Sequence, residues 1–134
     1  MSEPYLAIQV VMMPRDLSPH GTIFGGVILS YIDQAGAIGA RRAVIRSGGP
    51  PPALVTVAIN RVEFKRPVLV GDVVRFLTRK VRIGRTSITM HIRVEADRGG
   101  GVLHVTDAEV VYVGIDPTSR EPRPVPLLPE ATNG

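Results

Sequence analysis

The sequence contains no cysteine, which excludes disulfide bonds, thiolate nucleophiles and cysteine-bound zinc. A cytoplasmic location is compatible with this absence, and we expect one. The first 13 residues have neither a basic n-region nor a small-residue cleavage site, so we expect no targeting segment. No apolar stretch approaches the roughly 20 residues that a membrane span needs, so we expect no membrane partner either.

Aromatic residues are also scarce, at 4% of the chain, and the only lysines are Lys65 and Lys80. The positive charge behind the formal net charge of +4 therefore comes mainly from arginine, whose guanidinium forms bidentate hydrogen bonds with phosphate oxygens. Nucleic-acid binding usually needs a concentrated basic run and stacking aromatic side chains. Because the arginines are scattered and aromatic residues are few, we expect no nucleic-acid partner and favour a small ligand that carries phosphate.

Several catalytic signatures are missing from the chain. No G-x-S-x-G elbow is present, which argues against a serine hydrolase triad. Neither the Rossmann glycine pattern nor a P-loop occurs. The three histidines, His20, His91 and His104, lack the spacing of metal ligands, so we expect no metal site. His91 lies on the polar face of an alternating segment and is expected to be solvated rather than catalytic.

The pattern of apolar residues predicts one strand followed by one long helix. An apolar segment at 5–13 predicts the strand, and turn formers fill residues 14–24. The helix is predicted over 25–46, with Gly48 and Pro50 ending it. Its apolar residues cover most of its circumference, which is typical of a buried helix.

After Pro52 the apolar period changes to two, which predicts strands. The turns between these strands are short, so neighbouring strands are expected to be antiparallel. The predicted strands cover residues 53–64, 73–83, 86–96 and 102–113. The resulting α+β order, β-α-β-β-β-β, wraps an antiparallel sheet around one long central helix. Its open edges favour pairing of two subunits.

The 134 residues are about the size of one ordinary domain. Proline recurs between residues 117 and 129. We therefore expect residues 1–115 to form a single domain. Residues 116–134 are expected to form a proline-rich tail that lies extended on the surface or is disordered.

Asp33 lies in the middle of the predicted helix among apolar neighbours. An unpaired charge in such a place commonly costs several kcal/mol. Asp33 either belongs to a narrow polar stripe with Ser30 and Gln34, or it is a site residue whose cost is tolerated for function. The helix alone favours neither interpretation.

Two glycine-containing segments also have two interpretations each. Gly25 and Gly26 open the helix, where a ligand can approach backbone N–H groups at the positive end of the helix dipole, as in an oxyanion hole. Alternatively, they allow a tight crossing of helix and strand. Residues 84–87 join two strands, and their N–H groups, hydroxyls and guanidinium can hold phosphates. Without other support, a plain hairpin turn explains that segment more simply.

Ordered along the chain, the short motifs form a specific set, although each is weak by itself. They are Met13-Pro14-x-Asp16, Gly21-Thr-Ile-Phe-Gly-Gly26, Tyr31-Ile-Asp33 with Ala35-Gly-Ala37, Val62-x-Phe64-x-x-Pro67, Gly71-Asp72, Gly84-Arg-Thr-Ser87 and Arg-Pro-Val-Pro at 123–126. Over roughly residues 5–126, this set resembles the acyl-CoA thioesterases of the hotdog superfamily. It is most similar to the short bacterial acyl-CoA hydrolases, single-domain relatives of the cytosolic acyl-coenzyme A thioester hydrolases.

The resemblance implies the hotdog fold and hydrolysis of an acyl-CoA thioester to a free acid and CoA, within fatty acid metabolism. It implies that Asp33 acts as general base or nucleophile. It also implies that Gly25 offers its N–H to the thioester oxygen, with Gly26 beside it. Thr56 matches a hydroxyl position that helps to hold the lytic water or the substrate. No cofactor is expected, because CoA is part of the substrate.

The same resemblance implies where CoA binds. The turn made by Gly84, Arg85, Thr86 and Ser87 is similar to the segment that lines the path of the CoA phosphates and pantetheine. We expect Arg85, with nearby Arg82, to meet the phosphates. The chain is expected to form a homo-oligomer built from hotdog dimers, and the sequence leaves open a dimer, a tetramer or a hexamer made as a trimer of dimers.

One departure from the family concerns the loop before the helix. Relatives often carry asparagine where this chain has Ser18. Serine is shorter and lacks an amide donor, so the positioning of water or carbonyl is expected to differ, which bears on rate and substrate choice. His20 either compensates for this change or only caps the loop.

The length of the helix bears on how the site is built. A helix rises about 1.5 Å per residue, so Asp33 lies roughly 12 Å along the axis from Gly25. One small reaction centre can hardly touch both groups of the same helix. We therefore expect each site to combine Gly25 of one subunit with Asp33 of another, across two antiparallel helices.

Two other functions on the same scaffold stay open at this point. The first is a non-catalytic acyl-CoA binding module, which has no need for a carboxylate in the helix. The second is a hotdog dehydratase or hydratase, which typically pairs a histidine with its acidic residue. The absence of histidine from the predicted helix argues against the second.

Overall fold

The protein, described over residues 3–129 by a computed structural model, has one long helix and five strands in the predicted order. The elements are β1 (Tyr5–Val11), the short 3-10 helix η1 (Pro14–Asp16), α1 (Gly25–Arg46), β2 (Ala53–Asn60), β3 (Val73–Ile83), β4 (Ser87–Asp97) and β5 (Val102–Ile115). The predicted bounds of α1 and β3 are confirmed, because Gly48 and Pro50 follow the helix and Gly71 and Gly84 flank the strand.

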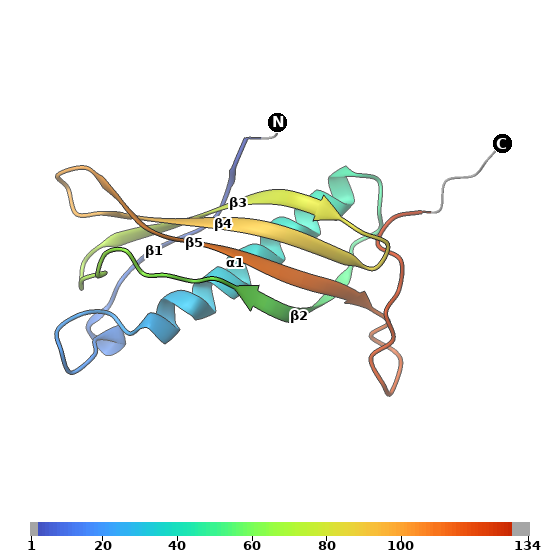
Figure 1. Ribbon diagram of the computed structural model, residues 1–134, viewed down its shortest axis with the longest axis horizontal. Coiled ribbons are helices and arrows are strands. Elements are labelled where there is room, and N and C mark those ends of the chain that lie inside the picture. The colour runs from blue at the N-terminus through green and yellow to red at the C-terminus, as the bar shows by residue number, and fades with distance from the viewer. Residues whose placement is uncertain (1–2, 130–134) are drawn as a thin grey trace.

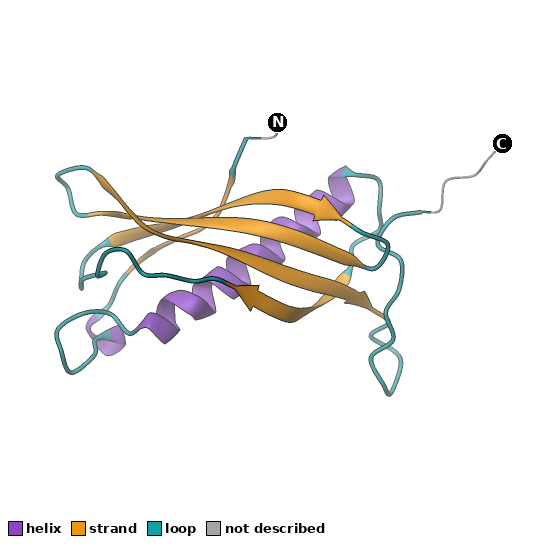
Figure 2. Cartoon of the chain, viewed as in Figure 1, coloured by secondary structure: helices purple, strands orange, loops and turns teal. Residues whose placement is uncertain are grey.

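The five strands form one sheet in the order β1-β3-β4-β5-β2, with every neighbouring pair antiparallel. α1 lies along one face of this sheet, and the strands curve over it (Figures 1 and 2). This is the hotdog arrangement, so the expected α+β fold is confirmed. β1 and β2 are the two edges of the sheet.

The apolar core lies between α1 and the sheet. Successive side chains of a strand point to opposite faces, so every second residue of β4 faces the helix. The predicted alternation is confirmed, because Ile88, Met90, Ile92 and Val94 are all buried. The helix contributes a matching buried stripe, made by Ile28, Ile32, Ala35, Ala40 and Val44.

Two glycines let α1 approach the sheet closely. A Cβ on Gly36 would overlap the hydroxyl of Tyr112, and a Cβ on Gly39 would lie 2.7 Å from the Cβ of Thr78. Glycine inside a helix costs about 1 kcal/mol relative to alanine. The close contact explains why glycine nevertheless occupies both positions.

In one respect the helix differs from the sequence prediction, because it is not buried on all sides. Ile38 is 43% exposed and Ile45 is 40% exposed. The sheet of a single chain covers only one face of the helix, so apolar residues on the other face stay uncovered. Nowhere in residues 3–129 does the fold contain a helix with the length and apolarity to cross a membrane.

Several strand ends also differ from the prediction. β1 stops at Val11 rather than at residue 13, because Met12 exchanges backbone hydrogen bonds with the turn at Gly71 and Asp72. β2 stops at Asn60 rather than at residue 64, because Arg61 takes a left-handed φ of 47° that breaks the extended backbone. β4 is displaced by one residue, at 87–97, and β5 continues to residue 115.

Edge strand β2 contains a bulge. Thr56 pairs with Tyr112 of β5, and Ala58 pairs with the next residue of β5, Val111. Val57 is therefore an extra residue that has no partner in the ladder, and its side chain is exposed. Bulges of this kind redirect the side chains beside them.

The first part of the proline-rich tail folds back in a turn, in which the N–H of Asp116 donates to the carbonyl of Arg123 (3.1 Å), and the part that follows is anchored to the core. The N–H of Val125 donates to the carbonyl of Gly114 (2.9 Å), and the N–H of Leu127 donates to the carbonyl of Arg85 (3.0 Å). Leu127 is only 2% exposed and lies against Gly49 and Gly114, where a Cβ would clash. The tail therefore closes one end of the core instead of lying only on the surface. Its residues 130–134 lie outside the described residues, and the domain boundary at residue 115 stays a prediction.

We expect Leu127→Ala to lower the free energy of unfolding by about 2–5 kcal/mol, because it leaves a cavity at the end of the core. Chemical denaturation measures the change. Val102→Ala, which shortens an exposed side chain of β5, is the matched control and should stay within about 0.5 kcal/mol of wild type. Equal stability of all three proteins would mean that the tail does not belong to the folded domain.

Candidate functional site

Asp33 projects from the side of α1 that faces β2. The hydroxyl of Thr56 donates a hydrogen bond to Oδ1 of Asp33, over 2.6 Å. Within residues 3–129 no protein donor meets the other carboxylate oxygen, Oδ2. Gln34 and Ser30 bond to each other (3.1 Å), and neither side chain bonds to Asp33. The half-buried carboxylate is held on one oxygen and open on the other.

Tyr112 fixes the backbone at the same point. Its hydroxyl donates to the carbonyl oxygen of Asp33, over 2.6 Å. Burial, and after it the neighbouring Asp33 carboxylate, raises the pKa of Tyr112 far above its ordinary value, so the phenol stays protonated as a donor. Because Tyr112 and Thr56 are directly paired across β5 and β2, one cross-strand pair holds both the backbone and the side chain of Asp33.

The start of α1 presents backbone donors. Phe24 precedes the helix and gives no side-chain cap. In the described part of the chain, no protein acceptor meets the N–H of Gly25 or of Gly26. A helix leaves its first N–H groups unpaired at the positive end of its dipole. These two donors can therefore stabilise a negative oxygen, as in an oxyanion hole.

A cleft of about 340 Å³ lies beside this helix start. The ring of Phe64 forms one wall, and a Cβ on Gly25 would come within 3.3 Å of its Cε2 atom. Ile23, Ile28 and Val68 give the cleft an apolar interior. Gly26, in contrast to Gly25, has open space beside its Cα, because a Cβ there would meet nothing within 4 Å.

Ser18 organises the loop before the helix. Its N–H donates to the carbonyl of Thr22 (2.7 Å), and its hydroxyl accepts from the N–H of His20 (3.3 Å). The side chain of His20 is exposed. In the single chain Ser18 therefore shapes the turn, and its expected part in positioning water or a carbonyl stays a prediction.

The segment Gly84-Arg85-Thr86-Ser87 forms a tight turn between β3 and β4, closed by the Gly84 N–H donating to the Ser87 carbonyl (2.7 Å). Its carbonyls at residues 85 and 86 accept from the tail and from Gly114, which fixes the turn. The side chains of Arg85 and Arg82 are exposed, and no ion pair involves either of them in residues 3–129.

The expected site residues thus fall into three groups in a single chain. Gly25 and Gly26 lie at one end of the helix, Asp33 and Thr56 lie near its middle, and the turn at 84–87 lies at the opposite end of the sheet (Figure 1). The structure brings Asp33 together with Thr56, but it does not bring either of them to Gly25 or to Arg85.

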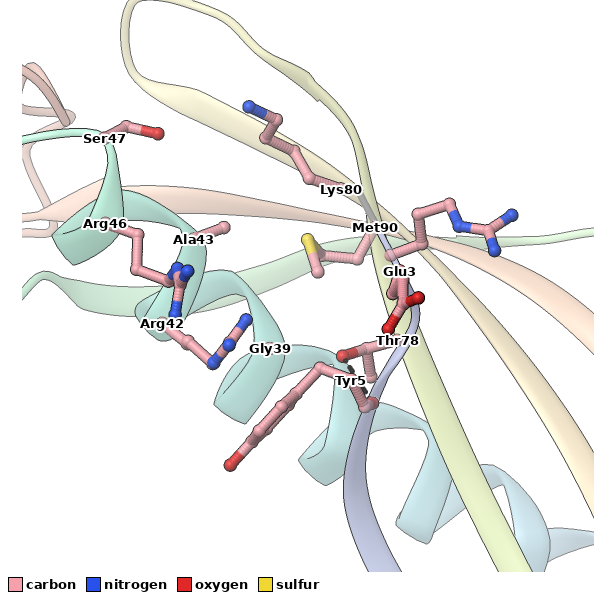
Figure 3. Close-up of a pocket in the computed structure, with 11 residues that line it drawn as sticks. Glu3, Tyr5, Gly39, Arg42, Ala43, Arg46, Ser47, Thr78, Lys80 and Met90 are labelled. Atoms are coloured by element: carbon pink, nitrogen blue, oxygen red, sulfur yellow. Dashed lines mark hydrogen bonds between the residues drawn. The ribbon is translucent and has the colours of Figure 1, made fainter. Parts of the chain in front are cut away.

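Other polar clusters lie away from these groups. Arg42, Arg46 and Lys80 line a cleft of about 120 Å³ between the end of α1 and β3 (Figure 3). That cleft faces the β1 edge of the sheet, whereas Asp33 faces the β2 edge. The Arg42 guanidinium lies 4.2 Å from the ring centre of Tyr5, which holds it in place.

The sequence suggested that His91 is solvated, but in the structure its side chain contacts a carboxylate. Its Nε2 lies 2.9 Å from Oδ1 of Asp107, and Nε2 of His104 lies against the other oxygen of that carboxylate. His91 reaches Asp107 because β4 and β5 are neighbours in the sheet, whereas His104 lies three residues before Asp107 on β5 itself. Across residues 3–129, no group of three His, Asp or Glu side chains could hold a metal ion.

Sequence reasoning assigned no role to Tyr112 or to Phe64. Tyr112 occupies a regular inward position of an alternating strand, where nothing distinguishes it from a core residue. Phe64 belongs to the motif Val62-x-Phe64-x-x-Pro67, and this membership was the one available signal, because the predicted strand of residues 53–64 included Phe64 as an ordinary strand residue.

Most of the chain is similar to known proteins. A family model described as "Thioesterase superfamily" matches residues 20–103. The acyl-CoA thioester hydrolase YciA of Salmonella typhimurium is 38% identical over 127 residues, which cover 91% of this chain and 90% of that protein.

Solved structures show the same relationship. The hexameric hotdog-fold thioesterase Cj0915 of Campylobacter jejuni is 38% identical, with a TM-score of 0.76 over 90% of this chain and 88% of that one. The hexameric thioesterase y2039 of Yersinia pestis is 32% identical, with a TM-score of 0.80 over 94% and 98%. The family match, the sequence identity and the shared fold agree, and the chain therefore belongs to the thioesterase superfamily of hotdog-fold enzymes.

Proposed function

We propose that this protein hydrolyses acyl-CoA thioesters to a free acid and CoA, with no cofactor beyond the CoA of the substrate. The observation that supports this best is the hydrogen bonding of the Asp33 carboxylate. Thr56 donates to one of its oxygens (2.6 Å), and the other oxygen has no protein donor within residues 3–129. The 38% identity to an acyl-CoA thioester hydrolase supports the substrate class. A cytoplasmic location is part of the same proposal.

In the proposed reaction, Asp33 acts as general base or as nucleophile. As a base, it takes a proton from water while the water oxygen bonds to the thioester carbonyl carbon. As a nucleophile, its own oxygen makes that bond, and water later cleaves the acyl-enzyme. In both routes the N–H of Gly25, with Gly26 beside it, stabilises the carbonyl oxygen while the C–S bond breaks. In the first route the CoA sulfur leaves with the proton that Asp33 took from water. In the second route the sulfur leaves as a thiolate that takes a proton from solvent, and the water that later cleaves the acyl-enzyme yields the free acid and restores the Asp33 carboxylate.

We expect Asp33→Asn to keep the fold and to lose at least about 100-fold in kcat, since an amide cannot accept the proton or attack. Release of free thiol from acyl-CoA measures the rate. Asp107→Asn changes a carboxylate outside the site in the same way and should keep nearly full activity. A folded Asp33→Asn protein with near-wild-type kcat would contradict this mechanism, and a wild-type protein that binds acyl-CoA without hydrolysing it would instead be an acyl-CoA binding module.

We further propose that Arg85, with Arg82 nearby, contacts CoA phosphates at the turn formed with Gly84, Thr86 and Ser87. Both guanidiniums are exposed, and the turn is fixed by backbone hydrogen bonds at both of its inner carbonyls. A fixed turn supports recognition because little order has to be imposed when the ligand binds.

Losing one charge-assisted contact costs about 1.5–3 kcal/mol, so Arg85→Ala should raise KM for acyl-CoA by roughly 10-fold to 100-fold. Thioesters that lack the nucleotide should be hydrolysed as by wild type. Arg93→Ala removes an arginine that pairs with Glu95 elsewhere and serves as the control. An equal loss on both kinds of substrate would show that Arg85 is structural.

The site is proposed to be shared between two subunits. Gly25 and Asp33 are roughly 12 Å apart along one helix axis, whereas a reacting centre needs both within about 3 Å. Two antiparallel helices in a dimer would bring Gly25 of one subunit to Asp33 of the other. We propose an assembly of such dimers, and the two hexameric relatives make a hexamer the expected state.

Complementation tests the shared site. Asp33→Asn protein is mixed with Gly25→Val protein under conditions that exchange subunits, and each parent should be nearly inactive. A mixed dimer has one doubly damaged site and one intact site, so activity should return toward half of wild type per mixed dimer. If subunits demonstrably exchange and no activity returns, both residues serve the site of one subunit.

A further inference from the structure

Phe64 is a large aromatic residue that is 43% exposed, although it lies directly beside the helix start. Its ring edge packs at Gly25, where a Cβ would be 3.3 Å from Cε2. The ring therefore occupies space next to the backbone N–H that is proposed to bind the thioester oxygen. In the single chain, an exposed aromatic side chain at such a position is available for contact with a ligand or with the second subunit of the proposed dimer.

The backbone on both sides of Phe64 is tied to β5. The Thr106 hydroxyl donates to the carbonyl of Glu63 (2.6 Å), and the N–H of Lys65 donates to the carbonyl of Val105 (2.9 Å). These two bonds hold the segment although regular strand β2 has already ended at Asn60. The ring cannot leave the cleft by movement of its loop unless both bonds break.

The facing wall of the cleft is equally fixed. Arg98 donates through Nη2 to the carbonyl of Pro67 (2.6 Å) and through Nε to the buried carboxylate of Asp72 (3.0 Å). The N–H of Ile23 donates to the carbonyl of Val68 (2.8 Å). Both walls of the cleft are therefore fixed by hydrogen bonds, and the size of the side chain at position 64 determines how much space remains for a ligand.

The lining indicates which part of an acyl-CoA fits. The buried side chains of the lining, Ile23, Ile28 and Val68, are apolar, while the exposed Lys65 and Arg66 also line the cleft. The backbone carbonyls of Pro67 and Val68 are already paired within the protein. The pantetheine arm carries amides that lose hydrogen bonds in such surroundings. An alkyl chain has none to lose.

We propose that Phe64 is a specificity-determining residue whose ring forms a wall of the acyl pocket beside Gly25 and limits the length of acyl chain that the site accepts. This proposal rests on the acyl-CoA hydrolase activity proposed above. It assigns the pocket to the acyl group and leaves the CoA nucleotide at the surface, where charged groups remain hydrated.

The experiment measures kcat/KM of wild type, Phe64→Ala and Phe64→Trp on butyryl-, octanoyl- and palmitoyl-CoA. One methylene in an apolar pocket changes kcat/KM by roughly 10-fold to 200-fold. Phe64→Ala should therefore raise the palmitoyl-to-butyryl ratio at least about 10-fold relative to wild type. Phe64→Trp, which fills more of the cleft, should lower the same ratio.

Leu69→Ala is the matched control, because Leu69 is an exposed apolar residue of the same loop and does not line the cleft. Its ratio should equal that of wild type, and thermal unfolding shows that each variant is folded. Unchanged ratios in both Phe64 variants, or a uniform rise of KM on all three substrates, would overturn the proposal. Absence of hydrolysis in wild type would instead overturn the proposed activity itself.

Discussion

The contact on which the rest of the site depends is the close packing of α1 against the sheet at Gly36. Without a side chain there, the Tyr112 hydroxyl reaches the helix backbone and donates to the Asp33 carbonyl (2.6 Å). That bond fixes the distance between the helix and β5. Thr56 is the residue of β2 that pairs with Tyr112, so the same packing brings Thr56 to the Asp33 carboxylate. A buried, neutral phenol suits this task, because it donates a hydrogen bond without adding a buried charge.

The fold could be predicted largely from local chemistry. Residues 25–46 and 73–83 were bounded correctly because glycine flanks the strand, and glycine followed by proline ends the helix. The end of β2 was missed, since the left-handed Arg61 follows from the path of the loop and not from the residue type. The burial of Leu127 was also missed, because it depends on Gly49 and Gly114, which come together only after folding.

The site was predictable in parts for the same reason. Asp33 stands out as a charge in an apolar helix, and Gly25 stands out with Gly26 as a glycine pair that opens this helix. Their separation along one axis was also foreseeable from helix geometry. The Asp33–Thr56 hydrogen bond needed the bulge of β2 and the register of β5, and neither leaves a mark in the alternation of apolar residues. Long-range pairing therefore carries the information that the sequence pattern lacks.

The bulge at Val57 has a consequence for how the sheet ends. An unpaired edge offers its N–H and C=O groups to any extended chain, which is the usual route to strand addition and fibre growth. The hydrogen-bonding register of β2 is interrupted, because the extra residue shifts the register of the segment after it relative to the segment before it. An incoming strand can match only one of these segments at a time. The irregularity beside Thr56 therefore limits the length of regular ladder that can form along this edge.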